Sequence, residues 1–255
     1  MRRDDFRPCA LIPVYNHGST VGAVAAALEA EGLPVILVDD GSDEDTRNRL
    51  SAIAERGAGC TLCTLPENQG KGAAVSFGLK QAAAAGYTHA LQVDADGQHD
   101  LADVPRFIRE ARKRPEVVVS GASVFDSSIP RGRRIGRKIT VFWVAVETLS
   151  RDIPEAMCGF RVYPLAPACA LLSRRALSPR MGFDIEVLVR LHWRGVRMRF
   201  VPTRVIYPPG GLSHFHMVRD NIAITLVHVR LFFGMLVRLP LLLTRMARRG
   251  GMRGG

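Results

Sequence analysis

The chain has 255 residues, enough for one large domain or for one domain with an extension. Apolar residues make up 47% of it, enough for a sizeable core, and the net charge of +11 is compatible with nucleic acid, an anionic membrane or a phosphorylated substrate as partner. The apolar stretch before Tyr15 is six residues long, too short for a secretory signal, and the five scattered cysteines favour buried thiols in a reducing cytosol.

Apolar runs alternate with helical segments through the first half of the chain. The runs predicted to be strands are 9–14, 35–39, 60–65, 89–94 and 116–121. The segments predicted to be helices are 19–31, 43–56, 71–85 and 101–113. Runs that are apolar on both faces and separated by helices predict an α/β fold, with a mostly parallel central sheet and helices on both faces.

Polar residues follow four of these strands at the point where each strand ends. They are Tyr15 and Asn16 after the first strand, Asp39 and Asp40 after the second, Asn68 after the third, and Asp94 and Asp96 after the fourth. Parallel sheets of this kind bind ligands at the carboxyl ends of their strands. We therefore expect these side chains to converge on one crevice.

The second half departs from this regular alternation. We expect a helix that follows the basic stretch 126–138 and runs to 149, a strand at 158–164, a helix at 183–195 and an extended segment at 196–207. A glycine- and proline-containing loop is predicted at 208–216.

The C-terminal segment is both apolar and cationic. Six arginines and no acidic residue follow Asp220, and the apolar run 231–243 is 13 residues long, short of the ~20 needed to cross a bilayer. On a helix, six arginines fall within an arc of about 120°: Arg219, Arg230, Arg238, Arg245, Arg248 and Arg249. This arrangement is typical of a helix in the membrane interface with its cationic face toward anionic head groups. Pro240 is expected to kink or break this helix. The alternative is a helix packed on the protein's own core with solvated arginines.

The segment LQVDADGQHD, residues 91–100, carries the clearest chemical signal. Asp94 and Asp96 flank a single residue at a strand end, and Gln98 adds a further oxygen, a set of hard donors that suits Mg²⁺ or Mn²⁺. Such a cation would bridge a diphosphate and offset the charge that develops on it as a sugar departs. Asp39 and Asp40 are candidates to accept hydrogen bonds from a base and a ribose.

Six segments occur in a characteristic order: IPVYN (12–16), VDDGSDEDT (38–46), ENQGKGAA (67–74), DADGQ (94–98), CGFRVYP (158–164) and FDIE (183–186). Together they resemble family 2 glycosyltransferases, in the branch of dolichyl-phosphate mannose synthases and polyprenyl-phosphate glucosyltransferases. The resemblance spans roughly residues 9 to 215 and implies the nucleotide-diphospho-sugar transferase fold of GT-A type, a divalent metal, and inversion at the anomeric carbon.

The resemblance also implies roles for individual residues. Asp39 and Asp40 would hold the nucleoside, Asp94 the sugar or the metal, and Asp96 with Gln98 the metal. The expected nucleotide-sugar contacts are Pro13, Tyr15, Asn16, Asp39, Asp40, Lys71, Asp94 and Ala95, with Lys71 reaching a phosphate. The expected catalytic residues are Asp96, Asp184, Glu186 and Arg161.

Two kinds of acceptor remain open. A polyprenyl phosphate is already anionic at neutral pH and needs no general base, but it needs a cationic cradle near the membrane, for which arginine suits phosphate. The candidate acceptor residues are Arg134, Arg137, Ser213 and His214. A hydroxyl acceptor instead needs a carboxylate or histidine to take its proton, and the candidates are Asp184, Glu186, Glu155 and His214. Asp184 and Glu186 also have a structural interpretation, because acidic groups stabilise the start of a helix.

We therefore expect an inverting, metal-dependent hexosyltransferase that binds peripherally to the inner face of the cell membrane and moves a sugar from a UDP- or GDP-sugar to a lipid-borne acceptor. Residues 1–216 would form the catalytic domain and 217–255 a membrane-associating helix with a basic tail. A nucleic-acid-binding protein is the non-enzyme alternative, and the absence of a nucleic-acid module signature argues against it. The sequence leaves the sugar and the oligomeric state open.

Overall fold

The computed structural model describes residues 5–56, 59–124, 131–205 and 217–251. The described strands form one sheet in the order β3-β2-β1-β4-β6-β5-β7. Their bounds are β1 (Pro8–Val14), β2 (Val35–Asp39), β3 (Cys60–Thr64), β4 (His89–Gln92), β5 (Val118–Val124), β6 (Arg161–Pro164) and β7 (Met198–Arg204). Only β6 runs antiparallel to its neighbours among them, so the predicted mostly parallel sheet is confirmed.

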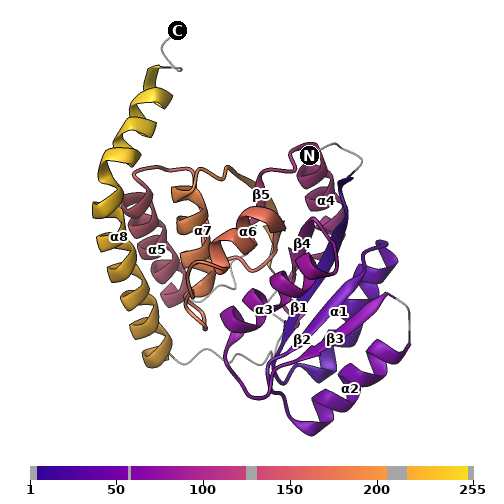
Figure 1. The fold of residues 1–255 in the computed structure, drawn as a ribbon. Helices are drawn as coiled ribbons and strands as arrows, with labels where there is room; N and C mark the ends of the chain where they lie inside the picture. The colour runs from indigo at the N-terminus through magenta and orange to yellow at the C-terminus, as the bar shows by residue number, and fades with distance from the viewer. Residues whose placement is uncertain (1–4, 57–58, 125–130, 206–216, 252–255) are drawn as a thin grey trace.

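Helices cover both faces of this sheet (Figure 1). Their bounds are α1 (Gly18–Ala30), α2 (Glu44–Glu55), α3 (Lys71–Ala84), α4 (Val104–Lys113), α5 (Arg131–Thr148), α6 (Leu165–Leu172), α7 (Phe183–Trp193) and α8 (Met217–Gly251). A 3₁₀ turn at Leu101–Asp103 precedes α4. The strand β2 is buried at every position, as expected for a strand covered on both sides.

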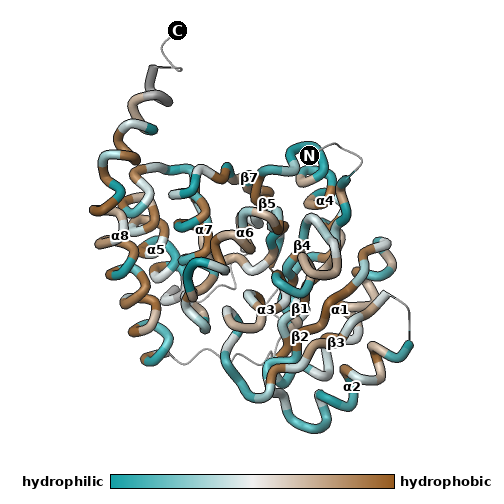
Figure 2. Tube along the Cα trace, in the orientation of Figure 1, coloured by the Kyte–Doolittle hydropathy of each residue, from teal (hydrophilic) through white to brown (hydrophobic). Residues whose placement is uncertain are grey.

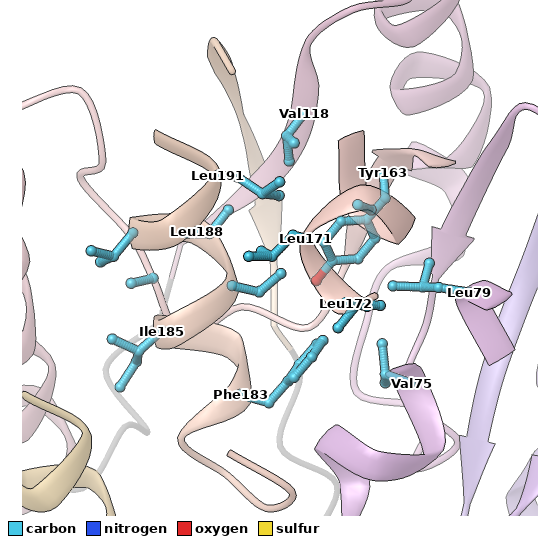
Figure 3. Close-up of a cluster of buried hydrophobic side chains, with 14 of the residues drawn as sticks. Val75, Leu79, Val118, Tyr163, Leu171, Leu172, Phe183, Ile185, Leu188 and Leu191 are labelled. Atoms are coloured by element: carbon cyan, nitrogen blue, oxygen red, sulfur yellow. The ribbon is translucent and has the colours of Figure 1, made fainter. Parts of the chain in front are cut away.

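Two clusters of buried apolar side chains lie on the two faces, because successive strand residues point to opposite sides. Leu11 and Ile36 contribute to the cluster formed with α3, α6, α7 and α8, whereas Ile12 and Leu37 contribute to the one formed with α1, α2 and α4. Figure 3 shows the first cluster, in which Leu188 and Leu191 of α7 lie near Leu171 of α6.

Before α8, three elements of the second half differ most from the sequence expectation. The strand predicted at 158–164 is shorter, since β6 begins only at Arg161. The helix α5 begins at Arg131, inside the basic stretch, because arginine and lysine are good helix formers and Arg134 and Lys138 remain exposed to water. The helix α6 was not predicted; its Pro167 lies in the first turn, where backbone N–H groups have no intrahelical partner.

The helix α8 stands beside α5 at one side of the molecule (Figure 1) and continues through Pro240, which the sequence suggested would kink or break it. Ile224, Val227 and Leu231 are buried in the cluster that contains α7, so one face of α8 belongs to the core. Among the described helices, the 30-residue segment Val218–Ala247 alone is long and apolar enough to cross a bilayer, judged by length and composition.

Candidate active site

The loops that follow β1, β2 and β4 meet at the carboxyl edge of the sheet and are joined by hydrogen bonds. The backbone N–H of Asp43 donates to Asn16 Oδ1 over 2.8 Å, and Asn16 N–H donates to Ser42 Oγ over 3.1 Å. Asn16 has φ of 54°, a left-handed conformation that asparagine tolerates. Thr20 Oγ1 donates to the carbonyl of Ala95 over 2.6 Å and so links the start of α1 to the loop after β4.

The adjacent carboxylates of Asp39 and Asp40 have different surroundings. Asp39 Oδ1 accepts from Ser42 N–H over 2.9 Å, and its buried Oδ2 has no hydrogen-bond partner among the described residues. Asp40 instead accepts from the backbone N–H groups of Gln69 and Gly70, each over 2.8 Å. Burial raises the pKa of Asp40, and these two N–H groups oppose the rise. Asp39 therefore keeps an oxygen for a ligand, while Asp40 holds the loop that precedes α3.

Lys71 lies between two carboxylates from distant parts of the chain. Its Nζ is 2.8 Å from each carboxylate oxygen of Asp94, after β4, and 3.2 Å from Asp184 Oδ2, at the start of α7. Burial alone would lower the pKa of Lys71, but the charges of Asp184 and Asp94 outweigh it and hold that pKa above its ordinary value. Burial would likewise raise the pKa of Asp94, but Lys71 above all holds it below the usual range.

Gly159 allows this charged cluster to form against the backbone. A Cβ atom at Gly159 would lie 2.5 Å from Asp94 Oδ2 and 2.7 Å from Lys71 Nζ, closer than real Cβ atoms approach other atoms. Glycine leaves this space to the carboxylate and the ammonium, and any larger residue would require at least one of these two side-chain ends to shift.

Asp96 lies beside this cluster with fewer protein partners. Its Oδ1 accepts from the backbone N–H of Gln98 over 3.0 Å. Burial, followed by the neighbouring charge of Asp94, raises the pKa of Asp96, so its surroundings oppose the ionised form. The ring of His99 stacks on Phe160, with centroids 5.2 Å apart, and its Nε2 lies 3.6 Å from Asp94 Oδ2.

The described residues include no group of three or more His, Cys, Asp or Glu side chains that could hold a metal ion by themselves. Mg²⁺ commonly takes only one or two protein carboxylates and completes its shell with substrate phosphates and water. The carboxylate of Asp96, disfavoured as an anion by burial and by Asp94, fits a cation of that kind. The chemistry of the donor set is thus compatible with the expected metal, held chiefly by Asp96.

Arg161 is fully buried behind the cluster. Its guanidinium donates to Ser120 Oγ over 3.1 Å, to Tyr163 Oη over 2.9 Å and to the carbonyl of Cys158 over 3.0 Å. It also donates to the backbone carbonyl of Asp184 over 3.3 Å. With its side chain 0% exposed, Arg161 holds the start of α7 in place and does not face open space in this structure.

Glu186 and Glu155 also have close protein partners. Glu186 Oε2 accepts from Ser178 N–H and its Oε1 pairs with Arg190, both over 2.7 Å. Glu155 Oε2 pairs with Arg137 Nη2 over 2.7 Å. Asp184 differs, because its Oδ1 is buried without a hydrogen bond among the described residues and lies 3.9 Å from Arg161 Nη1.

The remaining predicted site residues are spread more widely. Pro13 is buried in β1, Tyr15 is half-buried at its end, and Arg134 is exposed on α5. Ser213 and His214 lie outside the described residues. The structure also adds Arg180, whose Nη1 donates to Asn68 Oδ1 over 3.3 Å; no sequence motif marked it, because it lies outside the recognised segments.

Comparisons with known proteins identify the family of the chain. A model of glycosyl transferase family 2 matches residues 9–179. Dolichyl-phosphate beta-glucosyltransferase ALG5D of Trichomonas vaginalis is 29% identical over 163 residues, which cover 61% of this chain and 49% of that protein. Undecaprenyl-phosphate 4-deoxy-4-formamido-L-arabinose transferase of Serratia proteamaculans is 30% identical over 115 residues, 42% of this chain and 34% of that protein. The chain thus spans half or less of the length of these two relatives.

Among solved structures, glucosyl-3-phosphoglycerate synthase from Mycobacterium tuberculosis in complex with UDP superposes with a TM-score of 0.66 at 16% identity, covering 91% of this chain and 81% of that chain. At this identity the likeness shows the fold, which is the expected GT-A type. The same synthase has been solved with Mn²⁺, UDP-glucose and phosphoglyceric acid.

Proposed function

The chain belongs to glycosyl transferase family 2, and from this premise we propose that it transfers a sugar from a nucleotide diphosphate to a polyprenyl phosphate at the cytoplasmic face of a membrane. The observation that carries the proposal is the partly buried cluster of Lys71, Asp94 and Asp184 at the carboxyl edge of the sheet, where open α/β sheets bind ligands. The two relatives named for transfer to dolichyl and undecaprenyl phosphate support a lipid phosphate as acceptor.

The donor nucleoside is assigned to the loops after β1 and β2. The unpartnered Oδ2 of Asp39 can accept a hydrogen bond from a base N–H or a ribose hydroxyl. Tyr15 and Asn16 lie in the adjoining loop, which Ser42 and Asp43 hold in place. UDP bound to the mycobacterial synthase favours a UDP-sugar over a GDP-sugar.

The metal, Mg²⁺ or Mn²⁺, is assigned to Asp96, with Asp94 and Gln98 as further oxygen donors. When bound, it would offset the negative charge that develops on the leaving diphosphate. The chain's own Lys71 contributes in a different way. By pairing with both Asp94 and Asp184 it offsets part of the repulsion that these two carboxylates would exert on an anionic donor.

With a phosphate acceptor, the reaction needs no proton acceptor. A phosphate oxygen of the acceptor attacks the anomeric carbon, and the bond from that carbon to the diphosphate oxygen breaks. Both electrons of the broken bond leave with the nucleoside diphosphate, and the configuration at carbon inverts. Arg161 supports this geometry by holding the backbone of Asp184.

A hydroxyl acceptor is the second candidate, and one observation favours it. Asp184 Oδ1 is buried without a hydrogen-bond partner among the described residues, so it is free to take a proton from a hydroxyl. In that reaction the rate should fall at low pH as the base becomes protonated. A phosphate acceptor predicts a weaker acidic limb.

The test supplies the full chain with radiolabelled nucleotide sugars and either undecaprenyl phosphate or undecaprenol, with Mn²⁺, Mg²⁺ or a chelator. We expect label to enter the organic phase only with undecaprenyl phosphate and a divalent cation. Transfer to undecaprenol alone would replace the phosphate acceptor by a hydroxyl. Failure of every donor with both lipids would overturn the proposed activity.

A further inference from the structure

Large apolar side chains that remain exposed are concentrated on two helices. Among the described residues 15 large hydrophobic side chains are exposed, and all except Val124 belong to α5 or α8. Figure 2 shows hydrophobic positions recurring along the length of α8 between hydrophilic ones. Soluble monomers rarely expose contiguous apolar patches of this kind, which mark interaction sites.

The outer face of α8 carries large apolar side chains, with the exposed Arg219 and Arg230 at its edge. Ile222, Leu226, Phe233 and Val237 recur at the spacing of one helical face and point away from the buried face of the helix, and Val237 is 81% exposed. This differs from the sequence expectation, in which the arginines formed the outward face.

Two of the arginines attach α8 to the protein instead. Arg238 lies over the ring of Trp193, 4.7 Å from its centroid, and donates to the carbonyl of Gly234 over 2.8 Å. Arg245 donates to the carbonyl of Trp193 over 2.9 Å. These contacts fix the rotation of α8 about its axis and so decide which residues face outward.

A chain of aromatic rings joins the exposed faces of α5 and α8. The ring centroids of Phe142 and Trp143 are 5.6 Å apart, those of Trp143 and Phe232 6.3 Å, and those of Phe232 and Phe233 5.9 Å. Phe142 and Phe233, at its two ends, are each 62% exposed. We call these four residues the aromatic ladder. It makes the two helices one continuous surface.

Cationic side chains flank this surface. Arg134 and Lys138 are exposed on α5, and Arg219 and Arg230 are exposed on α8. Two copies of the chain joined through this face would bring like charges together, whereas an anionic bilayer complements them. Aromatic side chains between apolar and charged groups are also the composition of a membrane–water interface.

We propose that α5 and α8 together form one docking face for an anionic bilayer, with the aromatic ladder at the boundary between head groups and acyl chains. The inference rests on the proposed function in taking a membrane lipid as partner, and it adds α5 to the membrane contact. Docking by both helices fixes the orientation of the carboxyl edge of the sheet, and of the loops after β1, β2 and β4, relative to the membrane.

The experiment measures partitioning of the full chain onto vesicles of phosphatidylcholine with and without phosphatidylglycerol. Phe142→Ser on α5 and Phe233→Ser on α8 should each weaken binding to the anionic vesicles by roughly tenfold or more. Each substitution removes an aromatic ring that the bound protein would insert into the lipid. Val124→Ser serves as the matched control, since Val124 is 51% exposed on a different element, and should bind as the unaltered chain does.

A second readout follows Trp143 itself, which is 38% exposed. Its emission should shift to the blue on vesicle binding, and brominated lipids should quench it; Trp143→Phe leaves the buried Trp193 as the background. If Phe142→Ser binds vesicles as well as the unaltered chain, α8 acts alone and the inference is wrong. If the unaltered chain ignores vesicles and Phe142→Ser dissociates a dimer, the face joins two copies instead.

This experiment is separable from the test of activity. The Phe142→Ser variant should lose vesicle binding yet retain sugar transfer to a short, water-soluble isoprenyl phosphate. If vesicle binding depends on the aromatic ladder but the chain transfers no sugar, the docking face is supported and the proposed function is wrong. If the chain transfers sugar but does not bind vesicles, the proposed function is supported and the docking face is wrong.

Discussion

At the scale of single residues, Lys71 is the cation that pairs with two carboxylates of the site. Its ammonium lies within 3.2 Å of carboxylate oxygens from both Asp94 and Asp184. Breaking a buried ion pair by removing one partner leaves an uncompensated charge, which costs far more than the intact pair contributes. The loss should therefore appear in stability as well as in turnover.

We predict that Lys71→Met lowers the free energy of unfolding by roughly 3–5 kcal/mol, because the partly buried carboxylate of Asp94 and the buried carboxylate of Asp184 lose their shared cation. Urea denaturation followed by circular dichroism measures this loss. Lys80→Met, at an exposed position of the same helix, is the control and should change stability little. A Lys71→Met protein as stable as the unaltered chain would show that the cluster does not form in solution.

In contrast to Lys71, Asp96 should matter for activity and little for stability. Its pKa is raised by burial and by Asp94, so the fold does not favour its charge. Asp96→Ala should reduce metal-dependent turnover by about a hundredfold or more while leaving the melting temperature nearly unchanged. Asp45→Ala, on the exposed surface of α2, should leave both unchanged. Unaltered turnover in Asp96→Ala would remove this residue from the metal site.

Gly159 offers a steric test of the same cluster. Gly159→Ala places a Cβ atom 2.5 Å from Asp94 Oδ2, so we expect a loss of roughly 1–3 kcal/mol in stability and a fall in turnover. Gly136→Ala, on the exposed part of α5 with nothing within 4 Å of the added atom, should instead be neutral or stabilising. Thermal unfolding and turnover of both variants provide the comparison; equal behaviour of the two would contradict the close approach.

At the scale of elements, a buried pair of a carboxyl group and an imidazole joins α5 to α8. Glu147 Oε1 lies 2.7 Å from His228 Nδ1, and the carbonyl of Glu147 accepts from Trp193 Nε1 over 2.9 Å. Burial raises the pKa of Glu147, and the hydrogen bond and charge of His228 offset only part of the rise. The folded protein therefore holds the proton of Glu147 more tightly than the unfolded chain does.

The sign of the pH effect follows from this direction. A carboxyl group whose pKa is raised on folding stabilises the fold below its unfolded value of about 4.3, and that contribution is lost as the pH rises through the folded pKa. Glu147→Gln does not titrate, so its free energy of unfolding relative to the unaltered chain should increase with pH above that value. Urea unfolding across this range measures the difference, with the exposed Glu55→Gln as control; a difference that falls with pH would contradict it.

At the scale of the whole molecule, α8 is part of the core as well as of the surface. Ile224, Val227, Leu231 and Met235 are buried against the remainder of the protein, and each buried aliphatic side chain contributes about 1.5–3 kcal/mol. The sequence placed a domain boundary between residues 216 and 217. The helix α8, which begins there, shares one apolar cluster with the preceding part of the chain.

Deletion of residues 217–255 should consequently destabilise the remaining chain, besides abolishing vesicle binding. We expect a lower melting temperature and aggregation on size-exclusion chromatography, because the core cluster around α7 becomes exposed. A milder deletion of residues 248–255 is the control and should retain the melting temperature. An unchanged melting temperature after removal of 217–255 would show that α8 is a separable appendage.

Much of the fold and part of the site followed from sequence patterns. The doubly apolar runs predicted the strands of the sheet, and the polar residues at the ends of β1, β2 and β4 predicted loops that meet at one edge, since both patterns depend on residues close together in the chain. The family resemblance is confirmed by the match to residues 9–179. The weak points were α6 and the start of α5, where proline, glycine and arginine obscured the helical pattern.

What the sequence alone determined was thus the sheet, the family and the set of acidic residues at one edge. Only the tertiary structure decided the partner of each charge: Lys71 reaches Asp94 and Asp184, while Asp40 and Glu186 hold backbone N–H groups. It also decided that Arg238 and Arg245 turn inward and leave large apolar side chains on the outer face of α8. The physical reason is range: strand and helix periodicity is set by near neighbours, whereas a buried ion pair depends on which remote segments pack together.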